Sequence, residues 1–220
     1  MKKMETKQEQ IETKEIHVKK ALLVHGFNGS PDVFKEIRES LEERGILVYT
    51  VRYESTKPFQ DWIKIIENKI KEIGNSEEII LVGHSLGGSL SLYLSQRHKF
   101  KGLVLINSPV YLKKGTLFKV LVKFFNKRKE VEIRKVKYSM ESIRSIFSFL
   151  DELKGKTVIN SNSTLIIQSK KDYLVSNKSA KMIYNKINSE NKQLVNIGSG
   201  HTPLNQPVVI SSIMGFMGVL

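Results

Sequence analysis

The chain has 220 residues, of which 40% are hydrophobic and 26% charged, a balance that fits one globular domain with a sizeable core. It contains no cysteine, which excludes disulfides and cysteine-built metal sites and suits a reducing compartment. The formal net charge of +14 would suit an anionic partner such as nucleic acid or a membrane surface.

The first twenty residues are charged throughout and lack the apolar core of a secretory signal. Nowhere do eighteen apolar residues follow one another, so no transmembrane helix is expected, and we expect a cytoplasmic protein. Residues 1–16 are expected to form a mobile N-terminal arm, and residues 17–220 a single domain.

Short apolar runs rich in β-branched residues alternate with segments of helical period, a pattern typical of an α/β fold with a mostly parallel sheet flanked by helices. Several of these runs are apolar almost without interruption, as in strands covered on both faces. The expected elements in chain order are strand Ala21–Val24, helix Pro31–Arg44, strand Ile46–Val51, helix Phe59–Ile73, strand Glu78–Val82, strand Gly102–Ile106, strand Thr164–Gln168, helix Ser179–Ile187, strand Gln193–Ile197 and a helix after Asn205.

A candidate nucleophile lies in Gly83-His84-Ser85-Leu86-Gly87, which matches the pattern G-x-S-x-G. The pattern alone is a weak signal, and a glycine-rich turn with an incidental serine is the alternative. Here, however, a strand leads into the motif and a helical segment leads out. Small residues on both sides let the backbone turn sharply, so that Ser85 projects above the sheet and the helix N-terminus offers unpaired N–H groups to a developing negative charge.

The first strand is followed by His25-Gly26-Phe27-Asn28-Gly29. In an acyl-transfer enzyme, a backbone amide from such a loop pairs with the amide of the residue after the nucleophile to form an oxyanion hole. Those two donors would be the amides of Phe27 and Leu86. We expect His25 to hold the loop rather than act as a base.

A serine hydroxyl needs a base, and the base needs a carboxylate that fixes its tautomer. Only His98 and His201 follow Ser85 in the chain, and His98 belongs to a polar surface stretch. His201 comes directly after the last strand, and Asp172 comes just past Thr164–Gln168, at the sheet edge where ligands collect. We therefore predict Ser85, Asp172 and His201 as a catalytic triad, with a loop-capping role as the alternative for Asp172.

Together these segments resemble the small bacterial carboxylesterases of the α/β-hydrolase superfamily, close to bacillar thermostable esterases and monoacylglycerol lipases. The resemblance runs from Ala21 to about His201 and is carried by the residues at 23–29, 83–88, 168–172, 179–185 and 199–201. It implies a serine esterase without metal or cofactor, a small cap over an acyl pocket, and the same two oxyanion donors. The Gly-His-Gly of monoacylglycerol lipases is absent from Arg52-Tyr53-Glu54-Ser55, which bears on the substrate more than on the chemistry.

The longest interval between strands, at about 110–161, has helical period and is expected to be the small helical cap. Residues 113–137 contain ten Lys or Arg against two Glu, and apolar side chains between 117 and 125 interleave with lysines. We favour a cap whose apolar face closes the acyl pocket and whose lysines are solvated. Peripheral contact of this basic segment with an anionic membrane stays open, whereas no recognised nucleic-acid motif is present.

The sequence therefore predicts a serine hydrolase that cleaves carboxylic esters of short to medium acyl chain through an acyl-enzyme. A thioesterase, an amidase or a lysophospholipase on the same scaffold is an alternative, because a fold does not determine its substrate. A non-catalytic protein that binds membrane surfaces is the alternative from another class.

Overall fold

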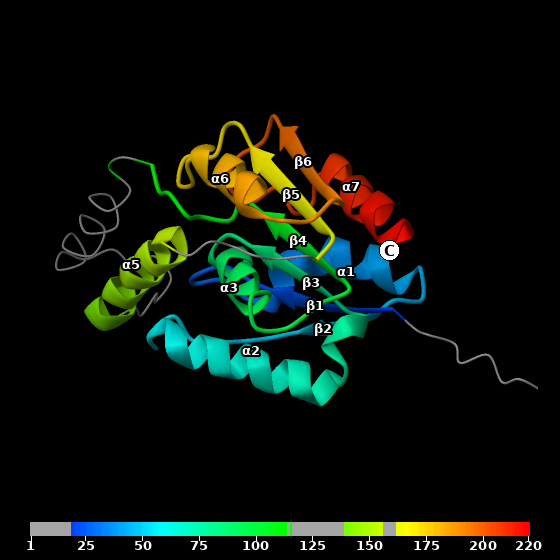
Figure 1. Ribbon diagram of the computed structural model, residues 1–220, viewed down its shortest axis with the longest axis horizontal. Coiled ribbons are helices and arrows are strands. Elements are labelled where there is room, and N and C mark those ends of the chain that lie inside the picture. The colour runs from blue at the N-terminus through cyan, green and yellow to red at the C-terminus, as the bar shows by residue number, and fades with distance from the viewer. Residues whose placement is uncertain (1–18, 114, 116–138, 156–161) are drawn as a thin grey trace, which may run out of the picture.

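The computed structural model describes residues 19–113, 115, 139–155 and 162–220. Six strands form one parallel sheet in the order β2-β1-β3-β4-β5-β6 (Figure 1). The strands are β1 Lys20–Val24, β2 Leu47–Thr50, β3 Ile79–His84, β4 Gly102–Ile106, β5 Thr164–Ser169 and β6 Lys192–Ile197. All six predicted strands are present, and the mostly parallel α/β sheet is confirmed.

Helices cover both faces of this sheet (Figure 1). Side chains of α1 and α7 share one apolar cluster with the sheet, and those of α2, α3, α5 and α6 share the other. The helices are η1 Pro31–Phe34, α1 Lys35–Glu42, α2 Phe59–Ile73, η2 Ser76–Glu78, α3 Leu86–Leu94, α5 Met140–Gly155, α6 Lys178–Lys186 and α7 Pro207–Gly218. The predicted helix from Pro31 is thus a 3₁₀ turn that continues into α1.

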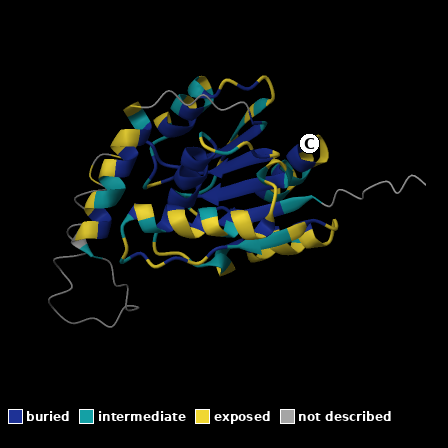
Figure 2. Ribbon diagram, turned by 60° about the horizontal axis from the view of Figure 1, so that its bottom comes forward, coloured by how far each residue is buried: buried dark blue, intermediate teal, exposed yellow. Residues whose placement is uncertain are grey.

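The central strands are buried on both faces, as their uninterrupted apolar sequences predict. In β3, Leu81 points into the cluster shared with α2 and α3, whereas Val82 points into the cluster shared with α1 and α7. Both side chains are completely buried. Figure 2 shows the sheet as a buried centre, with exposed residues on the outer faces of the helices.

The order in which the chain visits the strands places a crevice at one edge of the sheet. After β1 the chain adds β2 on one side, then returns past β1 and adds β3, β4, β5 and β6 on the other side. In open parallel sheets, ligands bind beyond the carboxyl ends of the strands where this order reverses. Here the reversal lies between β1 and β3, the strands followed by the Gly26 loop and by Ser85.

Helix α5 is the only helix among the described residues of the interval 110–161, and it packs against the helices of one face. The ring of Phe149 lies between α2 and α3, with its centroid 4.7 Å from that of Phe59 and 5.6 Å from that of Tyr93. The predicted arm 1–16 and the interleaved residues 117–125 lie outside the described residues. Within the described ranges, no helix combines the length and apolarity needed to cross a membrane.

Candidate active site

Ser85 occupies a sharp turn between β3 and α3 and has φ 53° and ψ −129°, a backbone conformation that favours glycine. The turn depends on three glycines, since a Cβ on Gly83 would lie 2.4 Å from the Cα of Gly88. A Cβ on Gly87 would lie 2.2 Å from the carbonyl oxygen of Val24. These contacts are the reason why the residues around the serine must be small.

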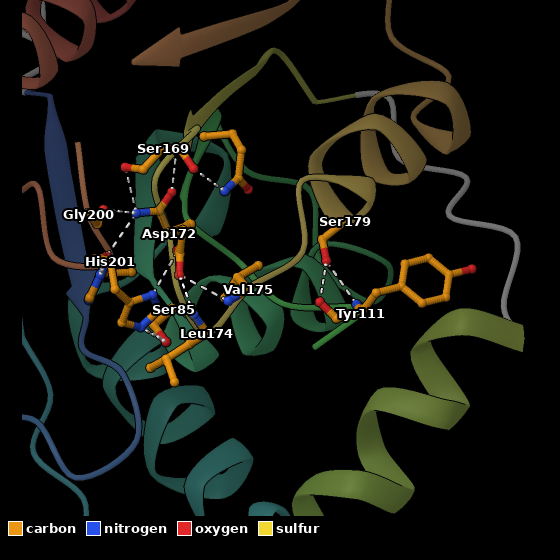
Figure 3. A network of polar contacts seen from close by, with 12 residues as sticks. Ser85, Tyr111, Ser169, Asp172, Leu174, Val175, Ser179, Gly200 and His201 are labelled. Carbon is orange, nitrogen blue, oxygen red and sulfur yellow. Dashed lines mark hydrogen bonds and ion pairs between the residues drawn. The ribbon is translucent and has the colours of Figure 1, made fainter. Parts of the chain in front are cut away.

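The structure brings Ser85, His201 and Asp172 together from three separate loops (Figure 3). The Oγ of Ser85 lies 3.0 Å from Nε2 of His201, and Nδ1 of His201 lies 2.8 Å from Oδ2 of Asp172. The Asp172 side chain is fully buried and that of His201 is 10% exposed. The three side chains therefore form a continuous hydrogen-bonded chain that ends at the Ser85 hydroxyl.

The second oxygen of Asp172 is also satisfied, since Oδ1 accepts hydrogen bonds from the amides of Leu174 (2.8 Å) and Val175 (3.0 Å). Burial raises the pKa of this carboxyl, but the hydrogen bonds from His201 and from the two amides outweigh burial, and the pKa lies below its usual value. Asp172 is therefore ionised at neutral pH.

This charge determines the tautomer of His201. An ionised carboxylate can only accept hydrogen bonds, so Nδ1 of His201 carries a hydrogen and donates a hydrogen bond to Asp172. Nε2 then presents its lone pair to the Ser85 hydroxyl. The arrangement has the geometry that general-base activation of a serine requires.

The loop after β1 lies directly beside Ser85. A Cβ on Gly26 would lie 2.9 Å from Cβ and 3.3 Å from Oγ of Ser85, so only glycine permits this approach. The loop is held on both sides of Gly26, by a hydrogen bond from the amide of Asn28 to Oγ of Ser55 (2.6 Å) and by one from the Tyr53 hydroxyl to the carbonyl of His25. A rigid loop is what a preformed anion site would need.

Phe27 and Leu86, the predicted oxyanion donors, both line the pocket that contains Ser85 and His201. Leu86 is the first residue of α3, so its amide points out of the helix end without an intrahelical partner. These positions agree with the prediction, while the binding of an oxyanion there stays a prediction.

The other candidate histidines lie elsewhere. His25 is buried, its Nδ1 lies 2.8 Å from the Gly26 carbonyl, and its ring stacks on Tyr53 with centroids 4.1 Å apart. Burial lowers the pKa of His25, which favours a neutral ring inside the loop. His98 follows the far end of α3, where its Nε2 lies 3.8 Å from a carboxylate oxygen of Glu67.

An apolar cavity of about 130 Å³ opens beside Ser85. It is of the same order as an apolar cavity that holds benzene. Helix α5 contributes one wall through side chains at the spacing i, i+3, i+4 and i+7, which places them on one face. The lining residues are Phe27, Ser85, Leu86, Pro109, Leu112, Ile143, Ile146, Phe147, Leu150, Leu174, Val175 and His201.

The opposite wall is held by the segment that leaves β4. Oγ of Ser179 accepts a hydrogen bond from the amide of Val110. It also accepts one from the amide of Tyr111 and donates one to the carbonyl of Tyr111 (Figure 3). An isolated antiparallel bridge between Leu112 and Val175 continues this contact. The pocket is thus built on fixed backbone on one side and on α5 on the other.

Sequence reasoning did not identify several residues that support this site. His84 and Asn107 both contact the carbonyl oxygen of His201. Nε2 of His84 lies 2.9 Å from this oxygen, and Nδ2 of Asn107 lies 2.8 Å from it. The position of Asn107 directly after β4, at the carboxyl edge of the sheet, was the available signal. For the α5 wall, the signal was the spacing of Ile143, Ile146, Phe147 and Leu150.

Proteins of known function resemble this chain over most of its length. A carboxylesterase of Bacillus subtilis (strain 168) is 24% identical over 200 residues, which cover 80% of this chain and 81% of the relative. A thermostable monoacylglycerol lipase of Bacillus sp. (strain H-257) is 25% identical over 221 residues, with 89% of this chain and 88% of the relative covered.

Solved structures show the same fold. The Paleococcus ferrophilus monoacylglycerol lipase superposes with a TM-score of 0.74 at 16% identity, covering 90% of this chain and 94% of the other. A structure from work on the metagenome-derived lipolytic enzymes LipS and LipT gives 0.75 at 19% identity, covering 91% and 94%. The model of the uncharacterised protein family UPF0227 matches residues 20–205. The chain therefore belongs to this family, and its fold is that of the α/β-hydrolase lipases and esterases.

Proposed function

We propose that the protein is a serine hydrolase that cleaves carboxylic esters of short to medium acyl chain. The observation that carries this proposal is the hydrogen-bonded chain Asp172–His201–Ser85, whose hydroxyl end lies in an apolar pocket. The named activities of the two Bacillus relatives, a carboxylesterase and a monoacylglycerol lipase, support it.

In the proposed reaction, Oγ of Ser85 attacks the ester carbonyl carbon while Nε2 of His201 takes the hydroxyl proton. The amides of Phe27 and Leu86 hold the resulting oxyanion, each worth about 3 kcal/mol by comparison with other such donors. The tetrahedral intermediate expels the alcohol, which receives the proton from His201. Water, activated by the same imidazole, then attacks the acyl-enzyme and releases the acid.

The pocket beside Ser85 is the natural place for the acyl chain, because apolar side chains form nearly all of its lining. Its volume of about 130 Å³ matches a short chain better than a long one. The wall formed by Ile143, Ile146, Phe147 and Leu150 excludes water from the acyl side of the reacting carbonyl.

A chain-length series of p-nitrophenyl esters tests the proposal. We expect hydrolysis by the native protein, highest for short to medium chains, and its loss in Ser85→Ala. Ser211→Ala, on the exposed face of α7, should retain the native rate. Equal rates for the native protein and Ser85→Ala would refute the assignment.

Parallel measurements separate the alternatives. Thioesters, amides and lysophospholipids of the same acyl chain distinguish a thioesterase, an amidase or a lysophospholipase from an esterase. A non-catalytic membrane-surface protein would sediment with anionic liposomes but would fail to react with a fluorophosphonate probe. Labelling that is abolished by Ser85→Ala would exclude that alternative.

A further inference from the structure

Strand β4 contributes no member of the Ser–His–Asp chain, yet its carboxyl end touches all three loops that do. The carbonyl of Ile106 accepts a hydrogen bond from the amide of Ser85 (2.8 Å). The next residue, Asn107, is completely buried and contacts Ser169 at the end of β5, where the loop of Asp172 begins, and the loop of His201. Its φ of 47° is in the left-handed region, which asparagine tolerates better than most residues.

Both polar atoms of the Asn107 side-chain amide have hydrogen-bond partners. Its Oδ1 accepts from the amide of Ser169 (2.7 Å), and because a backbone N–H can only donate, this contact fixes which end of the amide is oxygen. Nδ2 therefore faces three acceptors, namely the carbonyls of His201 (2.8 Å) and Gly200 (3.2 Å) and Oγ of Ser169 (2.9 Å). In Figure 3 dashed lines run from one side-chain nitrogen to the labelled partners Ser169, Gly200 and His201.

A second donor reaches the same carbonyl from the neighbouring strand. Nε2 of His84 lies 2.9 Å from the His201 oxygen. Burial lowers the pKa of His84 to about 4, so the ring is neutral at neutral pH, and the tautomer that donates from Nε2 is the one this contact requires. The main chain of His201 is thus held by β3 through His84 and by β4 through Asn107.

We propose that Asn107, together with His84, is a positioning residue of the active site. Both hold the main chain of His201 so that Nε2 stays within hydrogen-bonding distance of Ser85 Oγ. Neither residue lines the acyl pocket, so their effect on the reaction passes through His201. This inference rests on the proposed function, and it assigns roles to residues outside the Ser–His–Asp chain.

Asn107→Asp tests the role of the donor at nearly constant shape. The aspartate keeps the acceptor for the Ser169 amide and tolerates positive φ, but it replaces Nδ2 by an oxygen that faces two carbonyls. We expect kcat for p-nitrophenyl butyrate to fall roughly 10- to 100-fold, because small displacements of a reacting group have effects of this size. KM should stay within about twofold of the native value, since the acyl pocket is untouched.

The matched control is Asn162→Asp at the opposite end of β5. Asn162 is also buried, and its Oδ1 accepts a hydrogen bond from the amide of Phe100 (2.9 Å). This variant should retain the native kcat once both proteins are compared as folded material by circular dichroism. An equal loss of kcat in both variants would assign Asn107 to general stability and overturn the proposal.

A pair of substitutions at His84 gives an independent test that remains available if Asn107→Asp does not fold. Glutamine places an amide nitrogen near the position of Nε2, whereas leucine removes the donor. We expect His84→Gln to retain more kcat and faster fluorophosphonate labelling of Ser85 than His84→Leu, at similar KM. Equal kcat in the two variants, or native kcat in folded Asn107→Asp, would overturn the inference while leaving the proposed function intact. A native protein without esterase activity would overturn both.

Discussion

The backbone strain at Ser85 leads to an unusual expectation, namely that one inactivating substitution should stabilise the protein relative to another. With φ 53° and ψ −129°, Ser85 occupies a region that is open to glycine and unfavourable for any residue with a Cβ. Such conformations cost about 1–3 kcal/mol and persist where the surrounding structure enforces them. Ser85→Gly should release this strain, whereas Ser85→Ala should keep it.

The comparison between the two variants isolates the Cβ. Both lose the hydroxyl and its 3.0 Å hydrogen bond to His201, so that loss cancels. Glycine adds backbone entropy to the unfolded chain, which costs about 0.5–1 kcal/mol. The net expectation is that Ser85→Gly is more stable than Ser85→Ala by about 1 kcal/mol, or about 2–4 °C in Tm for a chain of this size.

Ser211 provides a control position, at which the glycine variant should be less stable than the alanine variant. It lies on the exposed face of α7, where its Oγ donates to the carbonyl of Val208 (3.2 Å). Within a helix, glycine is less stable than alanine by about 1 kcal/mol, so Ser211→Gly should unfold more readily than Ser211→Ala. Urea unfolding of the four variants measures the difference in free energy of unfolding between glycine and alanine at each position. If glycine were less stable than alanine at both positions, the assignment of strain to Ser85 would be refuted.

The Gly26 loop, the α5 wall of the pocket and the buried His84 can each be tested by substitution. Gly26→Ala should reduce kcat about 10- to 100-fold, because the added Cβ would lie 2.9 Å from Cβ of Ser85. Gly198→Ala, whose added Cβ would have no atom within 4 Å, should retain the native rate, and initial rates on a short ester measure both variants. Phe147 lines both the proposed acyl pocket and a neighbouring cavity of about 270 Å³, so Phe147→Ala should join the two spaces and shift the preferred p-nitrophenyl ester to longer chains. An unchanged chain-length profile would contradict this expectation. Between about pH 6.5 and 4, the unfolded chain binds a proton at His84 that the folded protein does not bind, because burial lowers the pKa of His84 to about 4. The free energy of unfolding should therefore fall by up to roughly 3 kcal/mol as the pH is lowered through this range. Urea unfolding at several pH values should show a smaller fall for His84→Gln.

Local patterns in the sequence were sufficient for most of the fold. Strands such as Gly102–Ile106 are buried on both faces, so their continuous apolar character is visible without knowledge of their neighbours. Helix Phe59–Ile73 was predicted with its observed bounds, because its apolar stripe and its terminal Gly74, with φ 110°, are both encoded within the segment. The Ser85 turn was also recognisable, since its glycines stand together in one short motif between a strand and a helix, even though Gly87 is required by a contact with Val24 of β1.

The meeting of Ser85, Asp172 and His201 could be predicted from their order and from their positions after parallel strands. Parallel strands place all their carboxyl ends at one edge, so residues that follow different strands converge there. The walls of the proposed acyl pocket could not be located in this way. The pocket-closing face predicted at 117–125 lies outside the described residues and stays a prediction. Among the described residues, one wall comes from residues 143–150 of α5, whose role at the pocket was not predicted.

What the sequence by itself determined is therefore the sheet, most of its helices and the three residues of the candidate triad. The tertiary structure alone decided which groups contact the main chain of those residues and hold them at hydrogen-bonding distance from one another. His84 and Asn107 meet the His201 carbonyl across 117 and 94 positions of the chain. Hydrogen bonds over such separations leave no periodicity in the sequence, because they depend on the spacing of neighbouring strands rather than on the spacing of neighbouring residues.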